Sequence, residues 1–406
     1  MTKEIEFQDK VGGVASPKGF FAAAASADVR KKGDDRLDTG VVYSPKPCTA
    51  AGVFTINAIK AAPVLQCQNV LTQGAPVHGI IANSGNANAC TGEQGKQDAT
   101  AMAHAGASVC GKDENSFFVC STGRIGEPLP MEPLLKAIKQ AGASALSEKR
   151  DNLDFGNSIL TSDTREKVCT ATFEVDGKLV TVGGSAKGAG MIQPNMATML
   201  AFITSDIEAT SAQLQEVVTL AVKSTFNAIT VDGDMSTNDT VLLLANGESG
   251  VVLDENSMEL YSKAVWKICD SLADKIVADG ERITKVVELL VSGAASEEDA
   301  ENVARAIGNS LLVKTSWYGN DPNWGRLIDA LGYAKATIDP DTIDISYEDI
   351  PALIKSTPLP DNKPQWKAVV SKARFSILIN LNQGEATYRL RASDLTEGYV
   401  DFNKSE

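Results

Sequence analysis

The dipeptide Asp176-Gly177 constrains the fold most strongly, because it lies between two runs rich in apolar and β-branched residues. These runs read KVCTATFEV and KLVTVGG. Asp-Gly is favoured in type I′ turns, in which both central residues need a positive φ angle. The sequence therefore predicts a β-hairpin here, and with it at least one antiparallel strand pair in a sheet.

Helices with recognisable ends alternate with short strand-like runs along the chain. We expect a helix from Thr91 to Gly111, with Thr91 and Gln94 as a capping box and Gly111 beyond its end. A strand is expected at LAFIT, residues 200–204. Thr210 and Gln213 then form a second capping box before apolar residues at helical spacing, namely Leu214, Val217, Val218, Ala221 and Val222.

The remainder of the chain repeats this mixture of elements. A helix is predicted over 258–278, and Gly280 is expected to end it in the left-handed conformation. TKVVELLV reads as a strand, and Ser296 with Asp299 marks a helix start. FSILINL and ATYRLR predict a closing hairpin. We expect an α/β or α+β fold with a catalytic domain at 1–283 and a smaller α/β domain at 284–406.

Composition and charge exclude several classes of protein. The chain has 406 residues, of which 43% are hydrophobic and 22% charged, as in ordinary globular proteins. A net charge of -14 repels nucleic acid and anionic lipid, and there is no dense run of basic residues. No apolar run is long enough for a membrane span. The amino terminus resembles neither a secretory signal nor a transit peptide, so we expect a cytoplasmic protein.

Metal-binding and phosphate-binding motifs are not supported. His78 and His104 are the only histidines, and there is neither a C-x-x-C nor an H-E-x-x-H motif. GGSAKGAGM lacks the spacing of a phosphate loop. VDGDMSTND resembles a calcium loop only in part, so a hydrogen-bonded polar loop is the better interpretation. Seven scattered cysteines are expected to be reduced, namely Cys48, Cys67, Cys90, Cys110, Cys120, Cys169 and Cys269.

Thr198 is the remaining candidate nucleophile, in the segment KGAGMIQPNMATML. A threonine becomes an effective nucleophile when it is amino-terminal, because its own α-amine, with a pKa of about 7.7–8.0, accepts the hydroxyl proton. An internal Thr198 must first be released by attack on the Ala197 carbonyl and hydrolysis of the resulting ester. From the spacing alone, a threonine that begins a strand is the commoner interpretation.

The segment around Thr198 resembles the self-cleavage motif of the ornithine acetyltransferases, also called bifunctional glutamate N-acetyltransferases. The resemblance extends in order over nearly the whole chain. Its further blocks are IANSGNANACTG (81–92), STGRIG (121–126), TSDT (161–164), TFNAITVDGDMSTNDT (225–240) and DPNWGR (321–326). The fold implied is the layered sandwich of self-cleaving aminopeptidases and ornithine acetyltransferases.

The resemblance implies roles for individual residues. Cleavage between Ala197 and Thr198 gives chains 1–197 and 198–406, and Thr198 is the catalytic nucleophile. Thr122 and Gly123 are implied to form the oxyanion hole, in which one donor is typically worth about 2.7–4 kcal/mol. The residues implied to bind substrate are Thr161, Lys187, Thr198, Glu281 and Asn403, with Lys187 suited to an α-carboxylate and Glu281 to the ornithine cation.

The sequence departs from the family pattern at three places. Arg282 and Ile283 follow Glu281, where two small residues are usual, so we expect that side of the pocket to have a different shape. The chain ends KSE after Asn403, without the usual terminal threonine. Arg124 follows the STG motif in place of a small apolar residue, which adds a cation near the oxyanion site.

The resemblance implies a ping-pong transfer of an acetyl group from N-acetylornithine to glutamate through an acetyl-threonine ester. Acetyl-CoA is a further donor in some members, no metal or organic cofactor is implied, and the cleaved subunits are expected to associate as a hetero-oligomer with two of each. Two alternatives stay open. One is an aminopeptidase or amidase with water as acceptor, and the other is a binding protein that never cleaves.

Overall fold

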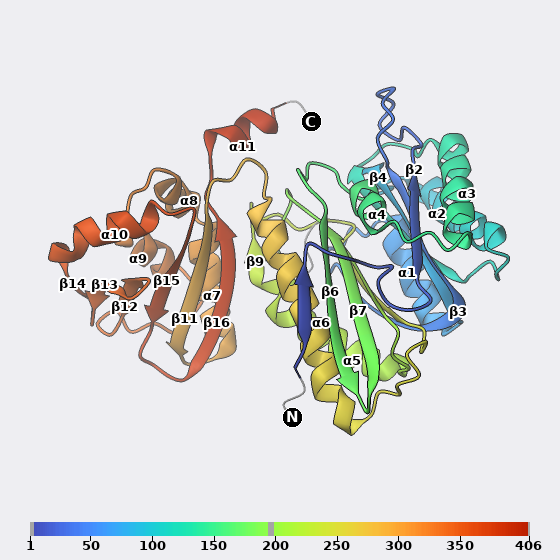
Figure 1. Cartoon of the computed structure of the whole chain (residues 1–406). Coiled ribbons are helices and arrows are strands. Elements are labelled where there is room, and N and C mark those ends of the chain that lie inside the picture. The colour runs from blue at the N-terminus through green and yellow to red at the C-terminus, as the bar shows by residue number, and fades with distance from the viewer. Residues whose placement is uncertain (1–3, 194–198, 405–406) are drawn as a thin grey trace. The chain divides into compact units, whose positions relative to one another are not determined.

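The computed structural model describes residues 4–193 and 199–404 (Figure 1). Its contacts divide the chain into two compact units. Unit 1 takes the described residues within 1–188, 195–227 and 234–276, and unit 2 those within 189–194, 228–233 and 277–406. The expected domains, 1–283 and 284–406, stay a prediction.

Unit 1 is built on a mixed sheet in the order β1-β6-β7-β8-β10-β3-β4-β5, with β2 added beside β3. The strands are β1 (Glu6–Asp9), β2 (Phe21–Ala25), β3 (Thr39–Phe54), β4 (Val77–Asn86), β5 (Phe117–Arg124), β6 (Lys167–Val175), β7 (Lys178–Lys187), β8 (Leu200–Ser205) and β10 (Thr240–Ala245). The helices are α1 (Ala62–Gln73), α2 (Gly92–Val109), α3 (Met131–Leu146), α4 (Asn152–Ser158), α5 (Ser211–Ser224) and α6 (Glu255–Ala278). Only β4–β5 and β8–β10 are parallel pairs among these described strands.

The long strand β3 joins two halves of this sheet. Its first part pairs with β2 and β4, and its last part pairs with β10. Alternate residues of β5 face opposite sides, as strand geometry requires. Phe117 and Val119 pack against α2 and α3, whereas Phe118 and Cys120 share a core with residues of β8 and β10. The two sheet halves therefore pack face to face, which confirms the layered α/β class.

The predicted hairpin is present as β6 and β7. Asp176 has a φ of 50° and Gly177 a φ of 75°, as a type I′ turn requires. The antiparallel pairing begins directly beside the turn, at Val175 and Lys178. The local turn signal was therefore sufficient to predict this pair.

The two predicted capping boxes have different outcomes. Thr210 and Gln213 form the expected reciprocal bonds at the start of α5, whose predicted apolar face is buried. At α2 the expected capping box is wrong, although the helix and the positive φ of Gly111 are found. The hydroxyl of Thr91 donates to Asn88, and the amide of Gln94 donates to Asp98. Nearby polar side chains thus compete for the groups that would have capped the helix.

Unit 2 contains a second mixed sheet, in the order β14-β13-β12-β15-β11-β16-β9. Its strands are β9 (Ile229–Thr230), β11 (Val286–Ala294), β12 (Asp344–Tyr347), β13 (Ile350–Ile354), β14 (Thr357–Pro358), β15 (Arg374–Asn380) and β16 (Ala386–Ser393). Its helices are α7 (Glu297–Asn309), α8 (Leu311–Tyr318), α9 (Trp324–Gly332), α10 (Lys363–Val370) and α11 (Glu397–Phe402). One face of β11, β12 and β15 shares its core with α7, α9 and α10.

The predicted closing hairpin of unit 2 is wrong. Both strands exist, as β15 and β16, but they do not pair with each other. The apolar strand β11 lies between them, parallel to β15 and antiparallel to β16. A central strand buries more apolar surface than an edge strand. Because β11 is rich in valine and leucine, it takes the place between β15 and β16.

The other predicted elements of this region are mostly confirmed. Ser296 caps α7 by accepting from the backbone N–H of Asp299. The helix predicted over 258–278 is α6. Gly280 does not adopt the left-handed conformation, so that detail is wrong; Arg282 has the positive φ, at 56°.

Among the helices of the described residues, none combines the length and the apolar character that crossing a bilayer requires.

Candidate active site

The predicted site residues that the structure describes lie in both units. Ala197 and Thr198 lie outside the described residues. The group in unit 1 consists of Thr122, Gly123, Thr161 and Lys187, and the group in unit 2 consists of Glu281 and Asn403.

Thr122 and Gly123 lie near the end of β5, against the neighbouring strand β4. Gly123 has a φ of 136°, and a Cβ atom there would lie 2.2 Å from the backbone carbon of Gly85 and 2.4 Å from the nitrogen of Asn86. Only glycine fits this close approach of two backbones. Thr122 is 3% exposed, and no hydrogen bond of its hydroxyl is found within residues 4–193 and 199–404, whereas the hydroxyl of the preceding Ser121 donates to Asn83. The Thr122 hydroxyl is therefore free to donate to a ligand.

Replacing Gly123 with alanine is expected to displace the end of β5. The added methyl group cannot fit against two backbones, so we expect a loss of about 1–3 kcal/mol in the free energy of unfolding. Catalytic activity should also fall, by up to about 100-fold, because small shifts of catalytic groups are costly. Thermal melting and transfer assays measure these effects.

Gly126 provides the matched control for this substitution. It also has a positive φ, of 86°, but a Cβ atom there would have nothing within 4 Å. Gly126→Ala therefore introduces backbone strain without the clash. If both alanine variants were equally stable and equally active, the close packing at Gly123 would not matter to the site.

Lys187 and Thr161, which were both predicted to bind substrate, are in direct contact. Lys187 is the last residue of β7, and its side chain is only 2% exposed. Its ammonium donates to the hydroxyl of Thr161 over 2.7 Å. A buried ammonium at a strand end can bind the carboxylate of a small molecule as a point charge.

A buried carboxylate, Asp163, organises this pair. One oxygen accepts from the ammonium of Lys167 and from the backbone N–H of Gly188, both over 2.7 Å. The other accepts from the backbone N–H of Thr161 over 3.0 Å and lies 3.8 Å from the Lys187 ammonium. Burial alone would raise the pKa of Asp163, but the two ammonium groups outweigh it and lower the pKa far below its ordinary value.

Asp163 and Lys167 were not predicted as site residues. Asp163 stands inside the TSDT block, but a motif does not reveal which side chains turn inward. Lys167 is the first residue of β6, and its side chain is fully buried. A lysine within a strand-forming apolar run was the available signal, because lysine is almost never fully buried without a partner.

The VDGDMSTND segment is the hydrogen-bonded polar loop that the sequence predicted. The side-chain amide of Asn238 donates to the carbonyls of Ala87 and Ser121, over 2.6 Å and 2.8 Å. The carboxylate of Asp239 accepts from the backbone N–H of Met199 over 3.0 Å. These two adjacent side chains therefore bind the end of β5 and the start of β8.

In unit 2, Glu281 and Asn403 are in direct contact. The amide of Asn403 donates to the Glu281 carboxylate over 3.0 Å. The backbone N–H of Glu281 donates to the Ala189 carbonyl. A side chain on Gly190 would lie 2.2 Å from a Glu281 oxygen, so the chain passes close against this carboxylate. Glu281 is thus held beside Ala189 and Gly190.

Arg282 and Arg124, the two arginines that depart from the family pattern, each contact a residue that was not predicted to bind substrate. The guanidinium of Arg282 lies 4.9 Å from the centre of the Phe402 ring, a cation–π contact within unit 2. Arg124 is more than half exposed, and its guanidinium lies 3.8 Å from the carboxylate of Glu127. Arg124 is therefore a partly neutralised surface cation close to Thr122 in sequence.

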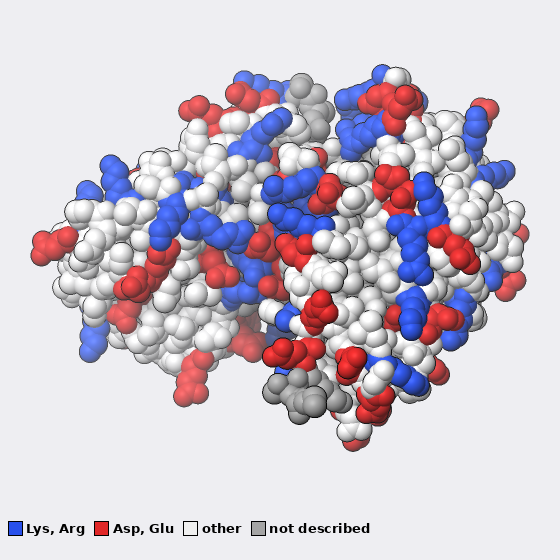
Figure 2. All heavy atoms as spheres, viewed as in Figure 1, with Lys and Arg blue, Asp and Glu red and all other residues white. Residues whose placement is uncertain are grey.

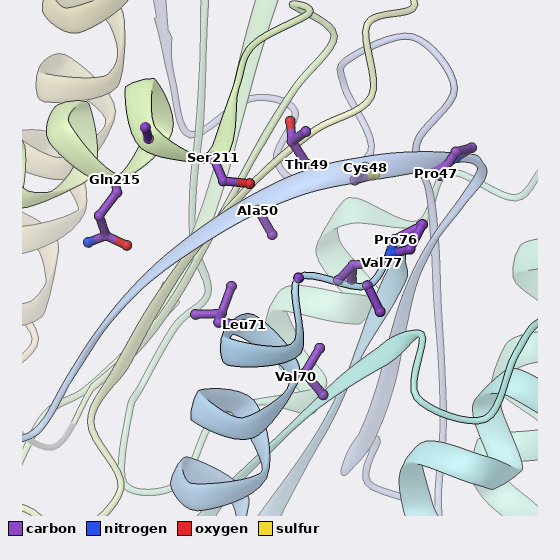
Figure 3. A pocket seen from close by; sticks show the side chains of 13 residues that line it. Pro47, Cys48, Thr49, Ala50, Val70, Leu71, Pro76, Val77, Ser211 and Gln215 are labelled. Carbon is purple, nitrogen blue, oxygen red and sulfur yellow. The ribbon is translucent and has the colours of Figure 1, made fainter.

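A separate pocket lies in unit 1, between α1, α5 and the middle of β3 (Figure 3). Its volume is about 510 Å³, and Val70, Leu71 and Ala50 give it an apolar wall, with Ser211 and Gln215 at one side. None of the predicted site residues that the structure describes lines this pocket. Figure 2 shows acidic and basic side chains intermixed over the visible face.

No group of three or more His, Cys, Asp or Glu side chains is arranged for a metal ion in the described parts of the chain. The expectation that no metal is needed stays a prediction, because this observation does not test it.

Comparison with known proteins shows extensive similarity. Residues 21–405 match the model of the ArgJ family. The arginine biosynthesis bifunctional protein ArgJ of Symbiobacterium thermophilum is 42% identical over 97% of this chain and 98% of its own length. The corresponding protein of Thermotoga neapolitana is 41% identical over 95% of this chain and 98% of its own length.

Solved structures with similar sequences were also found. A crystal structure of arginine biosynthesis bifunctional protein ArgJ from Bacillus halodurans is 37% identical, covering 50% of this chain and 98% of its own, with a TM-score of 0.48. A structure of ornithine acetyltransferase complexed with ornithine from Mycobacterium tuberculosis is 35% identical, covering 47% and 98%, with a TM-score of 0.43.

Proposed function

Because this chain belongs to the ArgJ family of arginine-biosynthesis enzymes, we propose that it transfers an acetyl group from N-acetylornithine to glutamate. The products are ornithine and N-acetylglutamate. Transfer proceeds in two steps, with the acetyl group carried between them as an ester on the hydroxyl of Thr198.

Self-cleavage prepares this nucleophile. The hydroxyl of Thr198 attacks the carbonyl carbon of Ala197, the peptide C–N bond breaks, and the nitrogen takes up the hydroxyl proton. Water then hydrolyses the ester, which leaves a carboxylate on Ala197 and a free α-amine on Thr198. In each later cycle this amine accepts the hydroxyl proton as Thr198 attacks the acetyl carbonyl of the donor.

The remaining residues bind charge that the substrates carry or develop. The hydroxyl of Thr122 and the backbone N–H of Gly123 donate to the oxygen of the tetrahedral intermediate. Lys187 and Thr161 bind the α-carboxylate of the amino acid. Glu281 and Asn403 bind the side-chain ammonium of ornithine.

The buried ammonium of Lys187 is the observation in the structure that most supports this proposal. It is fixed by Thr161 and Asp163 over the distances given above. Both substrates are α-amino acid derivatives with a free carboxylate, and a desolvated ammonium binds such a group more strongly than an exposed one. The free hydroxyl of Thr122 is consistent with a donor for an oxyanion.

The proposal has four further parts. The reaction uses no metal and no organic cofactor, because every step is an acyl or proton transfer between groups already named. Acetyl-CoA serves as a second acetyl donor. The cleaved chains 1–197 and 198–406 stay associated, two of each, and the enzyme works in the cytoplasm.

The acceptor is tested by following ornithine release from N-acetylornithine with and without glutamate. We expect sustained release only when glutamate is present, in step with N-acetylglutamate detected by mass spectrometry. Without glutamate, release should stop near one ornithine per active site, when the acetyl ester has formed. Sustained release in the absence of glutamate would make the enzyme a hydrolase that uses water as acceptor.

A further inference from the structure

The dipeptide Glu281-Arg282 of unit 2 contacts two successive residues at the end of α11. The carboxylate of Glu281 accepts from the side-chain amide of Asn403 over 3.0 Å. The guanidinium of Arg282 lies 4.9 Å from the centre of the Phe402 ring. An anion and a cation that are adjacent in the chain are therefore both held against the same end of this helix.

The backbone at Arg282 is held in an uncommon conformation. Its φ of 56° lies in the left-handed region, which few residues other than glycine adopt. The Arg282 carbonyl accepts from the hydroxyl of Thr396 over 2.7 Å, and Thr396 also caps α11. A Cβ atom on Gly398 would lie only 3.1 Å from the Cβ atom of Arg282, so α11 packs closely against the start of this side chain. These contacts determine where the Arg282 side chain leaves the backbone.

The guanidinium of Arg282 is held in place without being neutralised. Arg282 is exposed, and its side chain makes neither a hydrogen bond nor an ion pair within residues 4–193 and 199–404. A guanidinium over an aromatic ring keeps the N–H donors at its edge available. Two lysines near it in sequence are occupied, because Lys285 donates to Asn320 over 2.8 Å and Lys404 pairs with Asp401 over 2.5 Å. Arg282 is thus the one of these three cations that can still bind an anion.

The chemistry of the two substrates calls for such a cation. In the proposed reaction, Glu281 binds the side-chain ammonium of ornithine. The acceptor that follows, glutamate, carries a carboxylate in its side chain instead. A second carboxylate close to Glu281 is repelled unless a cation offsets it. A guanidinium suits this task because it binds a carboxylate through two parallel N–H···O bonds.

We propose that Arg282 is the specificity-determining residue for the acceptor: its guanidinium, held on the Phe402 ring, binds the side-chain carboxylate of glutamate. This inference rests on the proposed function, because it needs glutamate to be the acceptor. Glu281 then selects the ammonium of the donor in the first half of the reaction, and Arg282 selects the carboxylate of the acceptor in the second. The departure from the family pattern at Arg282 thereby gains a role.

Arg282→Gln tests the inference through the two half-reactions of the ping-pong cycle. The substitution keeps a long side chain beside Phe402 but removes the charge. We expect kcat/KM for glutamate to fall by about 10-fold or more, because hydrogen bonds between charged groups are the stronger ones. The value of kcat/KM for N-acetylornithine, which reports only the first half, should not change. A residue that merely held α11 and Asn403 in place would lower this second value as well.

Glutamine as the acceptor isolates the contribution of the substrate charge. It has the length of glutamate but no side-chain carboxylate, so Arg282→Gln should affect its kcat/KM little. The preference of the enzyme for glutamate over glutamine should therefore fall by the same factor of about 10. Arg282→Lys, which keeps the charge but not the planar pair of donors, should recover part of this preference. Lys404→Gln is the matched control, because its cation is already paired with Asp401, and it should leave the preference unchanged.

The outcomes separate this inference from the proposed function. Wild-type enzyme that transfers no acetyl group to glutamate would overturn the proposed function itself. Normal wild-type transfer with an unchanged preference for glutamate over glutamine in Arg282→Gln would overturn the inference alone. An equal loss for glutamate and N-acetylornithine, or an Arg282→Lys variant no better than Arg282→Gln, would do the same. Should the Gln variant not fold, Arg282→Asn undergoes the same measurements with the same expected result, since asparagine tolerates the left-handed conformation.

Discussion

A Thr198→Ala chain is expected to remain a single polypeptide and to transfer no acetyl group. Alanine lacks the hydroxyl that attacks Ala197, so the peptide bond between the two residues stays closed. Without cleavage there is neither a nucleophile nor an α-amine to act as its base. Loss of a catalytic nucleophile lowers kcat by up to about 10⁶-fold, so we expect a loss of at least about 1,000-fold here.

Denaturing electrophoresis and the transfer assay measure the two effects on one preparation. The wild type should give two bands, for 1–197 and 198–406, of nearly equal size. Thr198→Ser is the control, because serine keeps both a hydroxyl and an α-amine, and it should cleave and transfer at reduced rates. An uncleaved Thr198→Ala chain with undiminished transfer would show that another group carries the acetyl.

Local sequence signals predicted individual elements of the fold better than their pairing. Asp176-Gly177 specified its hairpin because the turn needs only two residues with positive φ. The strands β15 and β16 were recognised, but both pair with β11, which lies about 90 residues before β15 in the chain. Which strand takes the central place depends on burial in the assembled sheet, and no local pattern contains that information.

The site shows the same division between local and tertiary information. The blocks that resemble a known family identified Thr161 and Lys187, which are in contact. The partnership of Asp163 with Lys187 and Lys167 arises only when the end of β7 lies beside the 161–163 segment. Asp239 was likewise visible only as part of a polar loop, since its contact with Met199 crosses between two strands.

Replacing Asp163 with alanine is expected to destabilise the protein strongly. The side chains of Asp163 and Lys167 are fully buried, and that of Lys187 is 2% exposed. Alanine leaves two ammonium groups close together without their shared carboxylate. Breaking a buried ion pair by removing one partner costs about 3–5 kcal/mol, which urea unfolding would measure. Lys187 would also lose its orientation, so KM for N-acetylornithine should rise.

Glu93→Ala is the matched control, because the Glu93–Lys96 pair has a similar distance, 3.0 Å, but both side chains are more than half exposed. Such a pair contributes less than about 1 kcal/mol. An equal loss of unfolding free energy in Asp163→Ala and Glu93→Ala would show that burial of the Asp163 ion pairs adds no stability.

The pH dependence of stability gives a second test of Asp163, with Asp163→Asn as the variant. Since folding lowers the pKa of Asp163, the ionised carboxylate stabilises the folded protein at any pH above the unfolded pKa of about 3.9. This contribution is lost as the pH falls below that value and through the lower folded pKa. The stability difference between wild type and Asp163→Asn should therefore be constant from pH 5 to 7 and decrease only in stronger acid. A difference that stayed the same down to the acid unfolding transition would contradict the lowered pKa and the ion pairs that cause it.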